Sequence, residues 1–288
     1  MEIGWIGTGI MGAPMARRLI AAGHKLRVFN RSPEKAARLR GDGATVCADP
    51  AEAAAGVDTV FIMVPDTPDV EAVVAKIEPA LKAGQLVIDM STIAPASERA
   101  TAARLASKSI DYLDAPVSGG ETGAIEGTLT IMVGGETKAF GRAQPLFAHL
   151  GKQITHMGPA GAGQMTKLCN QIAVALALEA AAEALKLASA GGLDAAKVLE
   201  AIGAGAASSW QLKNLGPKIL AHDWRPGFFI KLIRKDLRLV TEAARDAGVA
   251  LPGLAMMTSM FNSAAALGHD LDGTQAVAAA LDRVAGLK

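Results

Sequence analysis

The chain has 288 residues, of which 50% are hydrophobic, 4% aromatic and 20% charged. Its 29 basic and 28 acidic side chains leave a net charge of +1, which excludes a broad basic surface for nucleic acid or an anionic membrane. The length exceeds that of one ordinary domain and predicts two.

Cysteine and histidine are scarce. Cys47 and Cys169 lack CxxC spacing, and His156 and His269 lack the spacing of metal ligands, so neither a disulfide framework nor a metal site is expected. The first residues do not read as a signal peptide, and no apolar run approaches the roughly 20 residues of a membrane span. A cytoplasmic protein is the expectation.

The first motif is a glycine-rich turn between a strand over residues 3–6 and a helix over residues 13–22. Gly7 permits a tight turn, Gly9 lets a pyrophosphate approach the backbone, and Gly12 allows close helix packing. Because strand, turn and helix follow in this order, the motif predicts a dinucleotide site that includes Ile10 and Met11.

The next strand, over residues 25–29, ends at Asn30, Arg31 and Ser32. NAD enzymes usually place an acid at this tip, whereas an arginine accommodates the 2′-phosphate of NADP. The tip therefore favours NADP(H) over NAD(H). The alternative is that Arg31 is a solvated loop residue.

Strands and helices then alternate up to about residue 149. Further strands are expected over 59–64, 86–90, 110–114 and 129–133, with helices over 68–81, 95–107 and 137–149. The alternation predicts an N-terminal Rossmann-like, doubly wound parallel sheet that binds ligands beyond the carboxyl ends of its strands. Val64, Pro65 and Thr92 lie at such exits and are candidate cofactor contacts. Ser91 or Thr92 could instead cap the helix that follows.

A second glycine pair follows the strand over 110–114. The amides of Ser118, Gly119 and Gly120, with the serine hydroxyl, can form a concave nest of donors for a carboxylate. A flexible Gly-Gly turn is the alternative.

From Gly161 onward the pattern is helical. We expect a nucleotide-binding domain over residues 1–161 and an all-helical domain over 162–288, joined by a long helix that begins near Gln164. Further helices are expected over 194–203, 211–221, 231–247, 252–267 and 274–285.

Two polar residues interrupt the apolar start of that long helix. Lys167 and Asn170 are three residues apart and share a face, so their tips can meet one ligand. Burial disfavours the charged form of a lysine, which suits proton exchange near neutral pH. Alternatively, Lys167 could extend its charged end into solvent. Lys231 and Lys235 are one turn apart, so both could face the cleft; a solvated basic face is the alternative.

Four stretches together resemble the β-hydroxyacid dehydrogenase family, which includes 3-hydroxyisobutyrate dehydrogenase. They are the glycine turn with Pro14, Met15 and Ala16; Asp114 to Gly120 with Ala124 and Gly127; Gly161 to Gly163 with Lys167 and Asn170; and Lys235, Asp236 and Leu237. One departure is Gln171, where the family often has a second asparagine.

The resemblance implies an NADP-dependent oxidoreductase that interconverts a short β-hydroxy acid and its semialdehyde. In such enzymes the residue at Lys167 is the acid/base and that at Asn170 holds the substrate. The residues at Ser118 to Gly120 bind its carboxylate, and those at Thr92 and Lys235 contact the cofactor. A homodimer or homotetramer is also implied. An imine reductase-like enzyme and a non-catalytic NADP-binding scaffold remain the alternatives.

Overall fold

A computed structural model describes residues 1–286. The chain divides into two compact units, Met1–Lys167 and Leu168–Lys288. The division lies inside the long helix α8 (Ala162–Ala190), whereas the sequence suggested a boundary at the start of that helix. The first turn of α8 belongs to the N-terminal unit because its polar groups bond to that unit, as described below.

The N-terminal unit is built on one sheet with the strand order β3-β2-β1-β4-β5-β6-β8-β7, and β9 pairs with β8. Its strands are β1 (Glu2–Ile6), β2 (Lys25–Phe29), β3 (Thr45–Val46), β4 (Thr59–Ile62), β5 (Leu86–Asp89), β6 (Asp111–Asp114), β7 (Val117–Ser118), β8 (Leu129–Gly135) and β9 (Gly151–Gly158). The strands β1 to β6 pair in parallel, so the doubly wound parallel sheet is confirmed.

The far side of the sheet departs from this pattern. The strand β8 runs antiparallel to both β6 and β7, and β9 runs parallel to β8. The sequence analysis missed β3 and β7, which have two residues each, and β9, which lies at an edge and is mostly exposed or half-buried. Such strands lack the continuous apolar run that marks a buried parallel strand.

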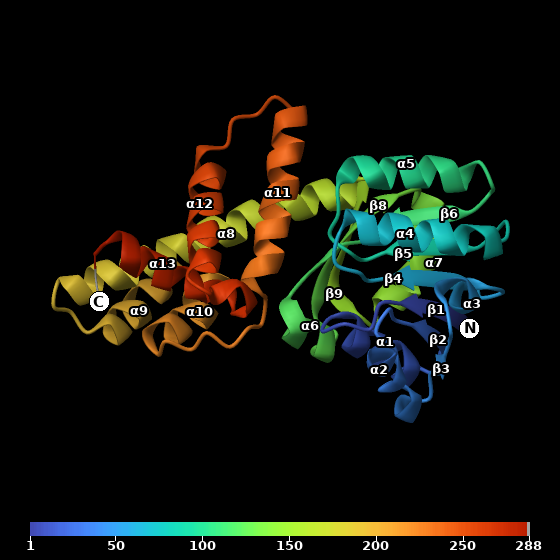
Figure 1. The fold of residues 1–288 in the computed structure, drawn as a ribbon, viewed down its shortest axis with the longest axis horizontal. Coiled ribbons are helices and arrows are strands. Elements are labelled where there is room, and N and C mark those ends of the chain that lie inside the picture. The colour runs from blue at the N-terminus through green and yellow to red at the C-terminus, as the bar shows by residue number, and fades with distance from the viewer. Residues whose placement is uncertain (287–288) are drawn as a thin grey trace. The chain divides into compact units, whose positions relative to one another are not determined.

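Helices cover both faces of this sheet (Figure 1). They are α1 (Gly12–Ala21), α2 (Pro33–Ala37), α3 (Pro50–Ala54), α4 (Thr67–Ile77), α5 (Pro95–Ala106), α6 (Gly120–Glu126) and α7 (Thr137–Phe147), with 3₁₀ turns at Arg40–Asp42 and Glu78–Ala80. Side chains that alternate along a strand supply two separate cores, because successive residues point to opposite faces. Phe61 packs in the core that contains Met15 and Phe147, whereas its neighbour Ile62 packs in the core that contains Val74.

The C-terminal unit contains no strand among its described residues. It consists of α8 from Leu168 onward, α9 (Ala195–Gly203), α10 (Trp210–Leu220), α11 (Ile230–Asp246), α12 (Pro252–Ala266) and α13 (Val277–Val284), with 3₁₀ turns at His269–Leu271 and Thr274–Ala276. Figure 1 shows α11 and α12 side by side. The all-helical prediction is confirmed, and no helix within residues 1–286 is both long and apolar enough to cross a membrane.

Candidate active site

In the glycine turn between β1 and α1, Gly7 and Gly12 pack against backbone atoms, whereas Gly9 faces open space. A Cβ added at Gly7, whose φ is +99°, would lie 2.1 Å from the Met63 carbonyl oxygen, and one at Gly12 would lie 2.0 Å from the Gly7 oxygen. A Cβ at Gly9 would meet nothing within 4 Å. The protein therefore requires glycine at two positions for its own packing, and the open space at Gly9 fits the approach of a pyrophosphate.

Thr8, inside the same turn, carries a further signal that the sequence analysis missed. Its side chain is 3% exposed, and within the described part of the chain its Oγ1 has no hydrogen-bond partner. A buried hydroxyl without a partner is costly, and a phosphate oxygen would supply the acceptor. The residues present at the turn thus fit a dinucleotide.

At the tip of β2, the side chains of Asn30 and Arg31, which the sequence analysis grouped with Ser32, have different partners. Asn30 is committed to the protein, because its Oδ1 accepts a hydrogen bond from the Thr8 amide at 2.9 Å and its Nδ2 donates to the Ser32 carbonyl at 3.1 Å. The Arg31 side chain is 85% exposed and contacts Asp69, with 3.2 Å between Nη1 and Oδ1. Asn30 thus fixes the loop, while Arg31 can reach a ligand.

The exits of β4 and β5 are tied to each other. The Val64 amide donates to the Ser91 hydroxyl at 3.0 Å. The cap residue of α5 is Ala94, which makes no side-chain cap bond, so the Ser91 hydroxyl serves the neighbouring exit instead of this helix. Pro65 and Thr92 lie on the two segments that this bond joins.

Asp114, at the end of β6, holds the start of α8. Its two carboxylate oxygens accept the amide of Gly161 at 2.7 Å and that of Gln164 at 2.9 Å. Burial raises the pKa of Asp114, and the hydrogen bonds from these amides oppose the rise. The anion also lies where a helix N-terminus favours negative charge. Lys167, one turn after Gln164, is 7% exposed.

Gln164 was not singled out by the sequence, yet it is fully buried and makes four hydrogen bonds. Besides its amide bond, its Oε1 accepts from the Ile93 amide at 3.1 Å, and its Nε2 donates to the Ser91 carbonyl at 2.8 Å and to Glu98 Oε1 at 2.7 Å. It therefore joins the start of α8 to the exit of β5 and to α5.

The Ser118 to Gly120 segment connects β7 to α6. Ser118 ends β7, where it pairs with Thr130 of β8, and Gly120 is the first residue of α6. The φ angles of Gly119 and Gly120 are +139° and +64°, a backbone path that favours glycine at both positions. The segment is neither a free loop nor fully buried.

In the C-terminal unit, two predicted site residues stand at the ends of one polar chain. Asn170 Nδ2 donates to Gln171 Oε1 at 2.8 Å, and Gln171 Nε2 donates to Asp236 Oδ2 at 2.5 Å. The Lys235 ammonium lies 2.7 Å from Asp236 Oδ1. Gln171, which departs from the family pattern, is 2% exposed. Its hydrogen bond to Asn170 Nδ2 fixes the orientation of the Asn170 amide.

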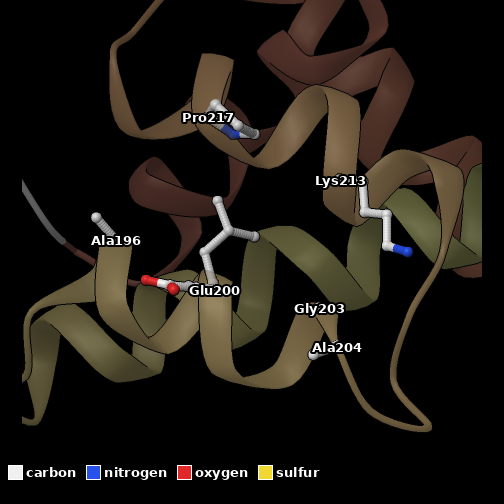
Figure 2. Close-up of a pocket in the computed structure, with 7 residues that line it drawn as sticks. Ala196, Glu200, Gly203, Ala204, Lys213 and Pro217 are labelled. Atoms are coloured by element: carbon white, nitrogen blue, oxygen red, sulfur yellow. The ribbon is translucent and has the colours of Figure 1, made fainter.

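Two surface hollows contain none of the predicted site residues. One lies between α9 and α10, with Glu200 and Lys213 at its wall (Figure 2). The other is lined by Gly84, Asp111 and Arg142, at the amino ends of β5 and β6, which is the edge opposite to ligand sites in such sheets. Within residues 1–286, no three His, Cys, Asp or Glu side chains are arranged to hold a metal ion.

Two family models match successive parts of the chain. Residues 2–158 match the NAD binding domain of 6-phosphogluconate dehydrogenase. Residues 161–280 match the model described as NAD-binding of NADP-dependent 3-hydroxyisobutyrate dehydrogenase.

Individual proteins match over nearly the whole length. The 2-hydroxy-3-oxopropionate reductase of Escherichia coli is 43% identical, over 100% of this chain and 99% of its own. The NAD-dependent L-serine dehydrogenase of Pseudomonas aeruginosa is 38% identical, over 90% and 91%. Among solved structures, 3-hydroxyisobutyrate dehydrogenase of Mycobacterium tuberculosis with L-serine superposes with a TM-score of 0.90 at 34% identity, over 97% of this chain and 98% of that one.

Proposed function

We propose that the chain, which belongs to the β-hydroxyacid dehydrogenase family, interconverts a short 3-hydroxy acid and its semialdehyde with NADP(H). We further propose that Lys167 is the acid/base. That the chain is an NAD(P)-dependent enzyme acting on a CH–OH group follows from the family itself. The substrate, the preference for NADP and the role of Lys167 are the proposal.

The observation that carries the proposal is the setting of Lys167. Lys167 is 7% exposed. It lies one turn after Gln164, whose hydrogen bonds anchor the start of α8 to the ends of β5 and β6. Doubly wound sheets bind their ligands at the carboxyl ends of strands, so a buried lysine one turn after this anchor supports an active site at that edge. Burying a lysine is costly and needs a reason, for which proton transfer is a common one.

The glycine turn, Val64, Pro65 and Thr92 would hold the dinucleotide, whose nicotinamide exchanges a hydride with the substrate carbon when bound. In the oxidative direction the hydroxyl proton passes to the neutral Lys167 amine as the carbonyl forms; in the reductive direction the ammonium returns it. Asn170 Nδ2 uses one of its two hydrogens on Gln171 Oε1, so the other would donate to the substrate oxygen, whose own proton passes to Lys167.

The proposed substrate class rests on two observations: the donors at Ser118 to Gly120 and the compounds named for two relatives. Ser118, Gly119 and Gly120 offer amides and a hydroxyl, which suit a carboxylate. The compounds named for two relatives, 2-hydroxy-3-oxopropionate and L-serine, are three-carbon acids with an oxygen on the third carbon. A 3-hydroxyisobutyrate-like acid has the same two groups at the same separation.

Preference for NADP rests on Arg31. Its guanidinium is 85% exposed at the end of β2 and can turn from Asp69 to a 2′-phosphate, with which it would form a bidentate, charge-assisted pair. Lys235 is proposed as a further cofactor contact on the basis of the family resemblance.

A turnover panel tests the function. Purified protein is assayed by nicotinamide absorbance with 3-hydroxyisobutyrate, glycerate, L-serine, their semialdehydes and a cyclic imine, each with NADP(H) and NAD(H). The proposal expects the highest kcat/KM for a 3-hydroxy acid or its semialdehyde with NADP(H). Turnover of the imine alone would indicate an imine reductase, and cofactor binding without turnover would indicate a scaffold.

Lys167→Ala tests the catalytic role. Loss of an acid/base is expected to lower kcat by about 100-fold or more, while the Kd for NADPH stays within about twofold, because the glycine turn is untouched. Lys152→Ala, at an exposed position on β9, is the matched control. A Lys167→Ala protein that keeps more than about a tenth of kcat would remove Lys167 from the mechanism.

A further inference from the structure

Four ionisable side chains that take no part in the proposed proton or hydride transfer lie buried together in the N-terminal unit. Asp89 ends β5, Glu98 lies in the first turn of α5, and Tyr112 and Asp114 lie on β6. Asp89, Glu98 and Asp114 are 0% exposed and Tyr112 is 4% exposed. Three carboxyl groups without solvent demand an account of their charge.

Glu98 is the centre of this group. Its Oε2 accepts from the Tyr112 hydroxyl at 2.5 Å, and its Oε1 accepts from Gln164 Nε2 at 2.7 Å. Its third neighbour is the Asp89 carboxyl, whose charge raises the pKa of Glu98. Glu98 therefore connects β5, β6 and the start of α8.

A hydrogen bond between the Glu98 and Asp89 carboxyl groups would require a proton on one of them. Asp89 Oδ1 accepts from the Ser91 amide at 2.9 Å, whereas its Oδ2 has no donor among the described residues when both carboxyls are ionised. Two adjacent buried carboxylates cannot both carry charge at acceptable cost. A proton on Glu98 supplies the donor that Asp89 Oδ2 lacks and removes one charge.

The electrostatics agree with this placement. Burial raises the pKa of Glu98 well above its usual value, and the charges of Asp89 and Asp114 raise it further. Burial raises the pKa of Asp89 to about 6. The titratable groups that face Glu98 are thus Asp89 from β5 and Tyr112 and Asp114 from β6. Arg99, the next residue on α5, is exposed.

We propose that Glu98 is a positioning residue which, protonated and hydrogen-bonded at once to Asp89, Tyr112 and Gln164, holds the first turn of α8 and thereby places the amine of Lys167. Gln164 also donates to the Ser91 carbonyl, so the start of α8 is held at the exit of β5 independently of Glu98. The placement of the Lys167 amine for catalysis rests on the proposed function. The protonation of Glu98 does not depend on it.

The side-chain chemistry defines two variants. Glu98→Gln has the shape and charge of a protonated glutamate: its oxygen can still accept from Gln164, and its amide can donate to Asp89 while the Tyr112 hydroxyl turns to accept. Glu98→Leu removes all three bonds and leaves Asp89, Tyr112 and Gln164 without this partner. Glu71→Gln is the matched control, since Glu71 is an exposed carboxylate that accepts the Ser97 hydroxyl of α5 at 2.8 Å.

The activity test compares these variants with the best substrate of the panel. Glu98→Gln is expected to keep kcat within about threefold, and Glu98→Leu to lose at least about tenfold in kcat while its Kd for NADPH stays within about twofold. Glu98→Leu with unchanged kcat would overturn the proposal, as would Glu98→Gln that behaves like the leucine variant or fails to fold.

The shared proton is tested without turnover. Carbon NMR of protein labelled at the glutamate carboxyl, in wild type and Glu98→Gln, is expected to show one protonated carboxyl at pH 7 that the substitution removes. A spectrum of ionised carboxylates only would overturn the proposal even if Lys167 proves catalytic. Conversely, failure of Lys167→Ala to lose activity refutes the proposed function and leaves the NMR result standing.

Discussion

The carboxylate of Asp114 accepts the amide of Gln164 at 2.9 Å across 50 residues of sequence, so the end of β6 caps the helix that carries Lys167. The second oxygen takes the Gly161 amide at 2.7 Å. One side chain thereby satisfies two of the four amides that a helix start leaves open.

Replacement of that carboxylate should be costly. Asp114→Asn puts an NH₂ group where one of the two amides donates, which leaves a buried donor unpaired and costs about 2 kcal/mol or more in unfolding free energy. The measurement is urea denaturation followed by circular dichroism. Asp111→Asn, which breaks only an exposed pair with Arg142, should lose less than about 1 kcal/mol. Equal losses in the two variants would contradict the capping role.

The glycine turn offers a pair of contrasting substitutions. Gly12→Ala places a methyl 2.0 Å from the Gly7 oxygen and should destabilise the protein by about 2 kcal/mol or more. Gly9→Ala meets no protein atom within 4 Å, so its stability should be unchanged, while its affinity for NADPH should fall by about tenfold because the methyl occupies the space for the pyrophosphate. Thermal unfolding and fluorescence titration separate the two effects. Normal NADPH binding by Gly9→Ala would refute the assigned site.

Arg31 and Asp69 should act in opposite directions on cofactor choice. Arg31→Ala removes the proposed partner of the 2′-phosphate and should raise KM for NADPH by about tenfold, with KM for NADH nearly unchanged. Asp69→Asn removes a competitor for Arg31 and should lower KM for NADPH by no more than about fivefold, because an exposed pair contributes at most about 1 kcal/mol. Arg17→Ala, which breaks a similar exposed pair with Asp42, is the control. An unchanged NADPH to NADH ratio in Arg31→Ala would exclude Arg31 from cofactor discrimination.

Asp89 should make stability fall as the pH rises from about 4 to about 7. The pKa of Asp89 is raised from 3.8 to about 6 in the folded protein. Between these values the folded state holds a proton that the unfolded state has released, so stability decreases with pH and the full cost, on the order of 3 kcal/mol, is reached above the folded pKa. Asp89→Asn should remove this part of the slope in urea denaturation at several pH values. The exposed Asp246→Asn should leave it in place. Parallel curves for wild type and Asp89→Asn would show that Asp89 is ionised throughout.

Local pattern in the sequence was sufficient for the architecture. The strand over 25–29 matched its observed bounds, and the helices of the C-terminal unit were found within one or two residues apart from the last, whose first turn is a 3₁₀ turn. These elements are long or strongly periodic, and the spacing of their apolar residues indicates the buried face without knowledge of the tertiary structure. The short strands β3 and β7 and the edge strand β9 carry no such period, and they were missed.

Partners of polar side chains were decided only by the tertiary structure. The sequence predicts Asn30 as a cofactor contact but gives no sign that its side-chain amide bonds Thr8 and Ser32. Asp114 was named only within a stretch that resembles the family, and the structure shows that its carboxylate caps α8. Gln164 and Glu98 were not predicted as partners, yet they meet across 66 residues. A glycine turn or a helical period is a property of neighbouring residues, so sequence determines it alone. Whether a buried carboxyl, amide or amine meets a donor, an acceptor or another acid depends on which strand ends the fold brings together.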